Sequence, residues 1–440
     1  MFSSSETVSW SESVRVPNNV KCEAWGDFTI EIPDSHNLDS ETVRGASYDL
    51  VIANKDFSGS GADVAIESFS VDYQGDPSNG SSKTQDQNTA AVWLHDVSDG
   101  VVRDCTAQNV LPDASGPSRQ FGVLLSDSTD SAVIDGEGNN TGYEGVGLRA
   151  ANQGCKAIRC RGENNRVHSV QVGYWTGEGA TLGGVFDDIT LRDCGGDIEV
   201  AVHGYGAASE PSSNITVEDC STTVALLGHL ENIDVEDGEG GCVDIAGTDN
   251  DTVIDGLNVH HQETDNNEAA VRIYDFSGNV IDIDNLNISG THMNVDKQVL
   301  RVYGSTVTVR NAWLSNCSYN AAGSVGLVDV GAGATAETLY LRGVYANSNE
   351  AVWATDTGSL IQRVVFSDSH LSDTFPTVAF DSGTINSVII DGKGEAALAG
   401  AAPDATNWQT GDIVEDTDNA GTLYYIHDDS VSGGASQIAT

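Results

Sequence analysis

Residues 268–290 read EAAVRIYDFSGNVIDIDNLNISG, and this stretch decides the fold of the chain. Apolar and polar residues alternate in AVRIYD and again in VIDIDNLNIS, with a polar turn between the two runs. An alternation with a period of two is typical of β-strands that bury one face. Val271 and Ile273 are expected to point inward. Arg272, Tyr274 and Asp275 fit either a catalytic or sugar-binding set or the solvated side of the strand.

The same pattern recurs along most of the chain at a spacing of about 24 to 30 residues. The aligned segments are AVWLHD, FGVLLSD, GVGLRA, VQVGYW, IEVAVHG, VALLGH, CVDIAG, AVRIYD, VLRVYG, VGLVDV, AVWATD and TVAFDS. A second strand-like stretch follows each of them, as in VVRDCTAQN and IDVEDGEGG, and many of these run into turns rich in Gly, Asn, Ser and Asp. A unit this small cannot bury its own apolar face, so its copies must stack.

These repeats predict an all-β fold, a right-handed single-stranded parallel β-helix of about twelve coils. Leucine-rich repeats need a Leu/Asn consensus that is missing, and propeller blades need about 40 to 45 residues each. We expect an N-terminal cap with the first strands at 1–53, plugged by Trp10, Trp25 and Phe28, and the β-helix itself at 54–395. Residues 396–440 are expected to form a linker and a small β-hairpin or oligomerisation module that turns at Asn419-Ala420-Gly421.

The formal charge is −46, because 66 acidic residues face only 20 basic ones along the 440-residue chain. The acids alternate with apolar residues throughout, which favours adaptation to molar salt over a disordered acidic tail. At about 1 M salt the Debye length falls to about 3 Å, and the self-repulsion is screened. This charge argues against nucleic acids and anionic membranes as partners. No run is apolar enough to insert in a bilayer, and the first residues lack the features of an export signal.

The eight cysteines include no CxxC pair, so no zinc site is expected. Four of them occupy one position of the second strand, with glycines in the coils that skip it: Cys105, Gly136, Cys160, Cys194, Cys220 and Gly238. This pattern predicts a ladder of small buried residues with free thiols. No cofactor and no metal are expected, since acidic stretches such as Asp282 and Asp284 more often form a solvated surface than a calcium site.

The N-terminal VRVPNNVKCEAWGDFTIEIP and the strand-turn-strand coils resemble the pectate lyase-like β-helix superfamily over roughly residues 14–396. Within it, the chain is similar to viral tailspike and fibre proteins of a halophilic, haloarchaeal system. The superfamily contains polysaccharide lyases, glycoside hydrolases, tailspikes and adhesins. The resemblance therefore implies a fold and leaves the function open.

Alternation places aromatic, basic and histidine side chains on the outward face of the first strand of many coils. The expected glycan- or receptor-binding set is Trp93, His95, Glu199, His203, His229, Arg272, Tyr274, Arg301, Tyr303 and Trp353. Aromatic faces stack on sugars and arginine forks bind carboxylates, but the same residues can also stabilise a ladder by cross-strand packing. Arg149, Asp244 and Asp329 lie on the same face.

Catalysis at this face would need two carboxylates about 6.5–9.5 Å apart in an inverting hydrolase, and the weak candidates are Glu199, Asp244 and Asp275. The residue set of polygalacturonases is not present, and only Asp187–Asp188, His203 and Arg272 echo it. We therefore expect a non-enzymatic surface protein of a haloarchaeal tailed virus, such as a tailspike, fibre, baseplate or head-turret component. The alternative is a polysaccharide lyase or glycoside hydrolase that acts on an acidic polysaccharide.

The expected partners are two further copies of the chain in a homotrimer, other virion proteins, and a host surface glycan or S-layer glycoprotein. The expected location is the virion surface after assembly in the host cytoplasm, with an extracellular location as the alternative.

Overall fold

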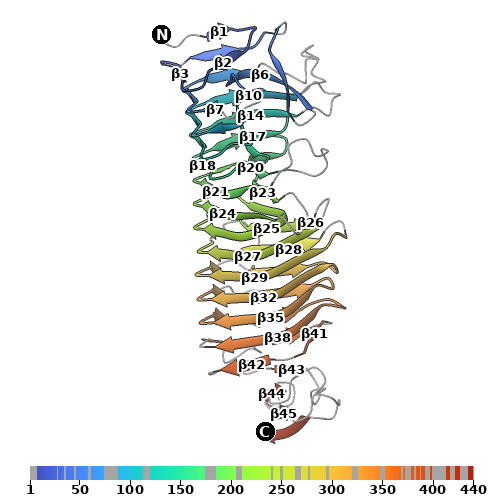
Figure 1. The fold of residues 1–440 in the computed structure, drawn as a ribbon. Helices are drawn as coiled ribbons and strands as arrows, with labels where there is room; N and C mark the ends of the chain where they lie inside the picture. The colour runs from blue at the N-terminus through green and yellow to red at the C-terminus, as the bar shows by residue number, and fades with distance from the viewer. Residues whose placement is uncertain are drawn as a thin grey trace. The chain divides into compact units, whose positions relative to one another are not determined.

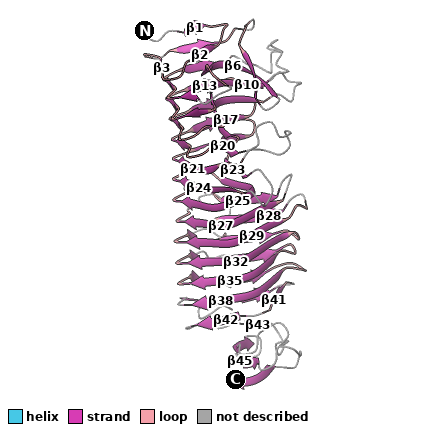
Figure 2. Ribbon diagram, viewed as in Figure 1, coloured by secondary structure: helices cyan, strands magenta, loops and turns pink. Residues whose placement is uncertain are grey.

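A computed structural model describes residues 7–26, 28–33, 36–43, 46–57, 61–73, 88–111, 119–173, 185–204, 211–238, 241–247, 251–262, 269–275, 278–293, 297–319, 326–346, 352–367, 370–371, 378–380, 383–386, 388–391, 397–398, 413–416, 422–426 and 435–439. All regular elements in these ranges are strands, so the expected all-β class is confirmed (Figure 2). The described part of the chain contains no helix long and apolar enough to cross a membrane. The chain divides into two compact units, residues 1–230 and 231–440.

In the first unit, parallel strands stack into three sheets, as the β-helix prediction requires. The first sheet contains β2 (Val14–Val16), β6 (Ala46–Asn54), β10 (Asn88–His95), β14 (Gln120–Ser126), β17 (Glu144–Arg149), β20 (His168–Gly173), β23 (Val200–Gly204) and the start of β25 (Val224–Glu236). The second sheet contains β3 (Lys21–Glu23), β8 (Ala65–Glu67), β12 (Val101–Arg103), β15 (Ala132–Ile134), β18 (Lys156–Ile158), β21 (Asp187–Arg192) and β24 (Ser212–Glu218).

The third sheet of this unit contains β1 (Thr7–Ser9), β4 (Thr29–Glu31), β9 (Ser70–Asp72), β13 (Thr106–Gln108), β16 (Glu137–Asn139), β19 (Arg161–Glu163) and β22 (Gly195–Gly196). Two short strands pair with each other, β7 (Gly61–Ala62) and β11 (Val97–Ser98). One strand departs from the parallel pattern, since β5 (Ser40–Val43) runs antiparallel to β6. Of the expected plugs, Phe28 is buried against Phe69, but Trp25 is 55% exposed and cannot act as one.

The second unit repeats the architecture with longer second-sheet strands, which appear as successive arrows in Figure 1. Its first sheet contains β26 (Val243–Gly247), β28 (Val271–Asp275), β31 (Leu300–Tyr303), β34 (Val328–Gly331), β37 (Val352–Ala354) and β40 (Val378–Phe380). Its second sheet contains β27 (Thr252–His260), β29 (Ile281–Ser289), β32 (Val307–Ser315), β35 (Thr335–Arg342), β38 (Leu360–Ser367), β41 (Thr384–Ile385) and β42 (Val388–Asp391). A third sheet contains β30 (His292–Met293), β33 (Ser318–Tyr319), β36 (Tyr345–Ala346) and β39 (His370–Leu371).

The last strands form a separate sheet in the second unit. Here β44 (Ile413–Asp416) and β46 (Ala435–Ala439) run antiparallel to β45 (Thr422–Ile426), and β43 (Ala397–Leu398) runs parallel to β44. The expected hairpin strands are thus present, and their expected turn lies outside the described residues. The domain boundaries after residues 53 and 395 stay predictions.

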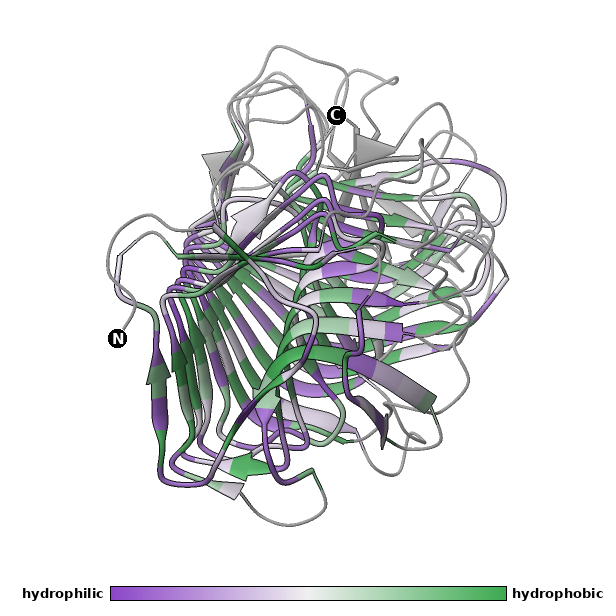
Figure 3. Ribbon diagram, turned by 90° about the horizontal axis from the view of Figure 1, so that it is seen from above, coloured by the Kyte–Doolittle hydropathy of each residue, from purple (hydrophilic) through white to green (hydrophobic). Residues whose placement is uncertain are grey.

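Below the N-terminal strands β2, β3 and β4, nine turns of the described chain have a strand in all three sheets, five in the first unit and four in the second. The expected number of about twelve coils is thus slightly high for complete three-strand turns. The inward rows are confirmed, since Val92, Leu94, Val271 and Ile273 are fully buried. Rows of apolar residues continue from strand to strand in Figure 3, with polar residues concentrated where the strands turn.

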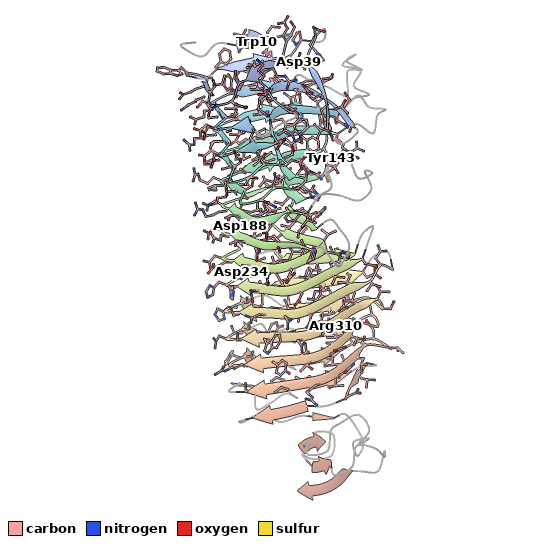
Figure 4. All side chains as sticks on the ribbon, in the orientation of Figure 1. Trp10, Asp39, Tyr143, Asp188, Asp234 and Arg310 are labelled. Carbon is pink, nitrogen blue, oxygen red and sulfur yellow. The ribbon has the colours of Figure 1, made fainter. Side chains whose placement is uncertain are left out.

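Corners between strands explain part of the acidity of the chain. One residue at each corner has a left-handed backbone, and in the first unit this series is Asp104, Asp135, Arg159, Asp193 and Asp219, with φ between 49° and 53°. Asp and Asn tolerate this conformation better than other residues with a side chain. Asp188, labelled in Figure 4, has the same left-handed backbone at the start of β21.

The residue after each of these corners points inward and forms the expected ladder of Cys105, Gly136, Cys160, Cys194 and Cys220. All eight cysteines are free thiols, as predicted, and all except Cys22 are buried. Burial raises the pKa of the Cys105 thiol to about 12, so this cysteine is an uncharged core residue at neutral pH.

Candidate functional site

The expected outward face of the first unit is covered, which corrects the prediction of an exposed aromatic surface there. Trp93 is fully buried, packs edge-on against Tyr48 and Phe57, and donates its indole N–H to Ser126 Oγ at 2.8 Å. His95 is also buried, with Nδ1 2.9 Å from the same hydroxyl. The physical reason is a second apolar layer outside the sheet, made of Val43, Tyr48, Leu50, Ala53, Ala90, Trp93, Phe121, Leu124 and Tyr143.

Farther along the same face, a charged network is buried at β17 and β20. Arg149 is fully buried and forms a bidentate ion pair with Glu144, with 2.9 Å between Nε and Oε2. Arg149 Nη1 donates to the carbonyl of Gly173 at 2.9 Å, and Nη2 lies 3.3 Å from Gln171 Oε1. Because a buried charge is costly unless it is paired, this network fixes the positions of all its members.

Two histidines extend this network. His203 Nδ1 lies 3.0 Å from the Gln171 amide nitrogen, and its ring contacts His168 edge-on with centroids 5.2 Å apart. His168 Nδ1 lies 3.2 Å from Glu199 Oε1, and Glu199 is the member with a partly exposed side chain, at 32%. The structure thus links the predicted Glu199 and His203 only through His168, and His203 is buried. The predicted His229 is half-buried.

Burial sets the protonation of His168. Desolvation lowers its pKa below the usual 6.5, against an opposing contribution from Glu199, while Arg149 lowers it further. The unfolded chain therefore takes up this proton at a higher pH than the folded chain. The stability that neutral His168 contributes is present above about pH 6.5 and is lost as the pH falls toward the folded pKa.

We expect the urea midpoint of the wild type to fall between pH 7.5 and pH 5.5, and the His168→Gln variant to show a smaller fall. His261→Gln is the matched control, because the His261 side chain is 62% exposed. If both variants have the wild-type pH dependence, neutral His168 does not carry this effect.

In the second unit the outward side chains form a register-matched row that is partly exposed on β28, β31 and β37, as alternation predicts, and buried on β26 and β34. Asp244, Arg272, Arg301, Asp329 and Trp353 occupy the same position on β26, β28, β31, β34 and β37. Tyr274 and Tyr303 occupy the neighbouring row. We call Arg272, Tyr274, Arg301 and Tyr303 the Arg/Tyr face.

Arg272 is partly exposed, and its guanidinium is paired within the protein. Its guanidinium forms a bidentate ion pair with Asp244, with 2.6 Å between Nε and Oδ1, and lies 4.8 Å from the centroid of the Tyr274 ring. The Tyr274 hydroxyl donates to Asp244 Oδ2 at 3.0 Å. The hydrogen bonds to Asp244 raise the pKa of Arg272, so this side chain cannot serve as a base at ordinary pH.

Arg301 repeats the sequence pattern but has a different environment. Its side chain is 40% exposed, and its nearest carboxylate oxygen is Asp329 Oδ2 at 3.9 Å from Nε. Its Nε is buried and makes no hydrogen bond, while the guanidinium lies 4.2 Å from the centroid of the Tyr303 ring. Asp329 instead accepts a hydrogen bond from Thr355 Oγ1 at 2.8 Å, and burial raises its pKa. Arg301 therefore keeps N–H groups that a ligand could use.

The weak catalytic candidates of this unit have structural partners. Asp244 is 5% exposed and is held by Arg272 and Tyr274. Asp275 accepts hydrogen bonds from the Gly278 backbone N–H and from Thr306 Oγ1, both at 2.7 Å, so it fastens a turn. Because both carboxylates are held by these hydrogen bonds, neither is positioned to act as a catalytic acid or base.

The acidic stretch around Asp282 and Asp284 also has internal partners, since Asp282 pairs with Arg310 (labelled in Figure 4) and Asp284 accepts from Asn311 at 2.9 Å. Among the described residues, the ligand atoms of Glu236, Asp237 and His261 lie within 4.8 Å of one another. All three are exposed, and this trio adds no second feature that would indicate a metal ion.

Two aromatic residues on the second sheet of this unit, Trp313 and Tyr340, were not among the predicted site residues. Trp313 and Tyr340 are neighbours in register, and their rings stack with centroids 5.3 Å apart and planes 6° apart. Trp313 is 37% exposed. Their signal is present in VTVRNAWLSN and TLYLR, where alternation turns both rings outward, but the predicted site residues all come from the first strand of each coil.

These features define the class of the protein as a right-handed parallel β-helix. The outward face of its first sheet is largely covered in the first unit and partly exposed in the second. No family model matches the chain, and no curated protein sequence matches it.

Solved structures with a similar fold include the A-module of the mannuronan C-5 epimerase AlgE6 from Azotobacter vinelandii, at 10% identity and a TM-score of 0.37, covering 88% of each chain. The adhesin PfbA from Streptococcus pneumoniae is similar at 10% identity and a TM-score of 0.39, over 99% of this chain and 90% of the other. Tailspike protein 3 of bacteriophage CBA120 is similar at 10% identity and a TM-score of 0.31, over 99% of this chain and 64% of the tailspike.

Proposed function

We propose that this protein is a non-enzymatic surface component that adheres to glycans, and that Arg301 with Tyr303 recognises an acidic group on the glycan. The observation that carries the proposal is the contrast between the two arginines of the Arg/Tyr face. The guanidinium of Arg272 forms a bidentate ion pair with Asp244, whereas the Nε atom of Arg301 lies 3.9 Å from the nearest Asp329 oxygen. A half-exposed cation in a chain with so few basic residues is suited to an anion from outside.

The chemistry of the pair favours a sugar carboxylate or sulfate. A guanidinium presents parallel N–H donors whose geometry matches a planar or tetrahedral oxyanion. Tyr303 lies under the guanidinium and fixes its plane, so less side-chain freedom is lost on binding. Gly331, on the next strand, leaves the space that the Tyr303 ring occupies, since a Cβ there would lie 2.6 Å from Tyr303 Cζ.

The wider proposal is a haloarchaeal tailed-virus component, a tailspike, fibre, baseplate or head-turret protein, that works as a homotrimer on the virion surface. Its partners would be other virion proteins and a host glycan or S-layer glycoprotein. The net charge of −46 supports a brine environment, where screening limits the range of repulsion between acidic residues to about 3 Å. At this salt concentration the repulsion from distant acidic residues is screened, so the Arg301 guanidinium can bind an anion although the whole protein is acidic.

Binding of three oligosaccharide classes in about 1 M KCl tests this proposal: oligogalacturonides, sulfated dextran oligomers and neutral dextran oligomers. We expect Arg301→Gln to weaken binding of the acidic probes by about tenfold to a hundredfold, because it removes charge-assisted hydrogen bonds. Arg310→Gln is the matched control, since it removes an exposed arginine that Asp282 already pairs. Equal affinity of wild type and Arg301→Gln for every acidic probe would contradict the proposal.

The alternative is a polysaccharide lyase or glycoside hydrolase. One feature favours it, the carboxylate–imidazole pair of Glu199 and His168, which is able to exchange protons. Release of unsaturated or reducing ends from any probe, lost in Glu199→Gln, would establish this alternative and overturn the non-enzymatic part of the proposal.

A further inference from the structure

We propose that the second sheet of the second unit carries a separate carbohydrate site, in which Trp313 stacks on a neutral hexopyranose unit. The site is a groove of about 430 Å³ over β27, β29, β32 and β35. Its walls and floor include Asn258, Asn287, Trp313, Tyr340, Ser315 and Arg342. It stands on a different sheet from the Arg/Tyr face and holds whether or not Arg301 binds an acidic group.

Register explains how the groove is shaped. Asn258, Asn287, Trp313 and Tyr340 occupy one outward position on four successive strands, which are about 4.8 Å apart. The short side chains of Asn258 and Asn287 thus lie next to the large rings of Trp313 and Tyr340. Tyr340 covers one face of the Trp313 indole, so the other face is directed toward the preceding strand, where Asn287 leaves room above it.

An exposed aromatic ring next to side-chain amides suits the binding of a sugar ring. The C–H face of a pyranose is apolar and packs on an indole, while its hydroxyl groups at the ring edge need hydrogen-bond partners. Asn287 Nδ2 lies 3.4 Å from Asn258 Oδ1, and the described structure gives the Asn258 amide N–H₂ and the Asn287 carbonyl no other partner. These two groups can donate to and accept from one ligand.

The charge of the lining argues for a neutral ligand. None of the described residues that line this groove carries a carboxylate, although the chain contains 66 acidic residues. A cationic ligand therefore has no counter-charge here. The floor offers amides and a hydroxyl, which match sugar hydroxyl groups, and Arg342 is exposed at the rim.

Calorimetric titration of the full-length protein with neutral hexasaccharides of glucose, mannose and galactose, each up to about 10 mM, tests the site. We expect at least one of them to bind, and Trp313→Ala to weaken that binding by about tenfold or more. Trp313→Phe should retain most of the affinity because a ring remains. Tyr345→Ala is the matched control, since Tyr345 is exposed to the same extent as Trp313 and does not line the groove.

Unchanged urea midpoints of the variants will show that each is folded. The inference is overturned if no neutral hexasaccharide binds the wild type, or if Trp313→Ala binds as well as the wild type. It is also overturned if Trp313→Ala weakens only the acidic probes. Loss of acidic binding in Arg301→Gln with intact neutral binding would separate the two sites, so either can fail without the other.

Discussion

Replacing Arg149 with alanine is expected to destabilise the first unit by about 3–5 kcal/mol, because the change leaves the Glu144 carboxylate buried without its partner. The arginine also packs over two rings, with its guanidinium carbon 5.6 Å from the Phe121 centroid and 5.3 Å from that of Tyr143. Those contacts are lost together with the ion pair. Urea unfolding followed by circular dichroism measures the effect as a lower midpoint.

Arg159→Ala is the control for this prediction. Arg159 makes an equally good bidentate pair, with 2.6 and 2.7 Å to the two oxygens of Asp135, but its side chain is 50% exposed. An exposed pair contributes about 1 kcal/mol or less. Equal losses in the two variants would contradict the argument from burial. The double variant Glu144→Gln/Arg149→Met should recover much of the loss, because it leaves no buried charge.

The Gly138→Ala variant is expected to lose about 3 kcal/mol or more, since the added methyl group has no space. A Cβ at Gly138 on β16 would collide with the backbone of Gly145 on β17, and one at Gly122 would lie 2.5 Å from the Gly145 carbonyl oxygen. The first and third sheets therefore approach here with no side chain between them. Backbone atoms cannot rotate away as a flexible side chain can.

Gly247→Ala provides the comparison, because a Cβ there would meet only side-chain atoms, the nearest being Ile281 Cγ1 at 3.2 Å. We expect a change of less than about 1 kcal/mol at this position. The urea midpoints of the two variants, each compared with that of the wild type, measure this difference in stability. A tolerated Gly138→Ala would mean that the two sheets can separate at little cost.

The repeat in the sequence correctly predicted the fold and many individual positions. Val271 and Ile273 are core residues, and Cys105, Cys160, Cys194 and Cys220 form a buried ladder of thiols. These features depend on local rules: side chains alternate along a strand, and Asp or Asn adopts the left-handed corner conformation. Repetition then brings equivalent residues into one row, so one coil predicts the next.

The candidate site followed the same rules only in part. Alternation correctly turned Arg272 and Arg301 outward, but it could not distinguish them, because their partners lie on neighbouring strands about 28 residues away. It also predicted an exposed Trp93, which is buried in an apolar cluster and packs against Tyr48 and Phe57. Whether an outward face meets solvent depends on segments packed over it, and no periodic pattern records that packing.

The sequence by itself thus determined the β-helix, its inward rows and its free cysteines, since each follows from the preference of a residue within its own coil. Only the tertiary structure decided that Arg149 is a buried charge, that Gly138 faces backbone, and that Trp313 meets Tyr340 beside two amides. Those outcomes depend on which residues share a row after the coils stack. A shift of one residue in register would send each of these side chains to the opposite face.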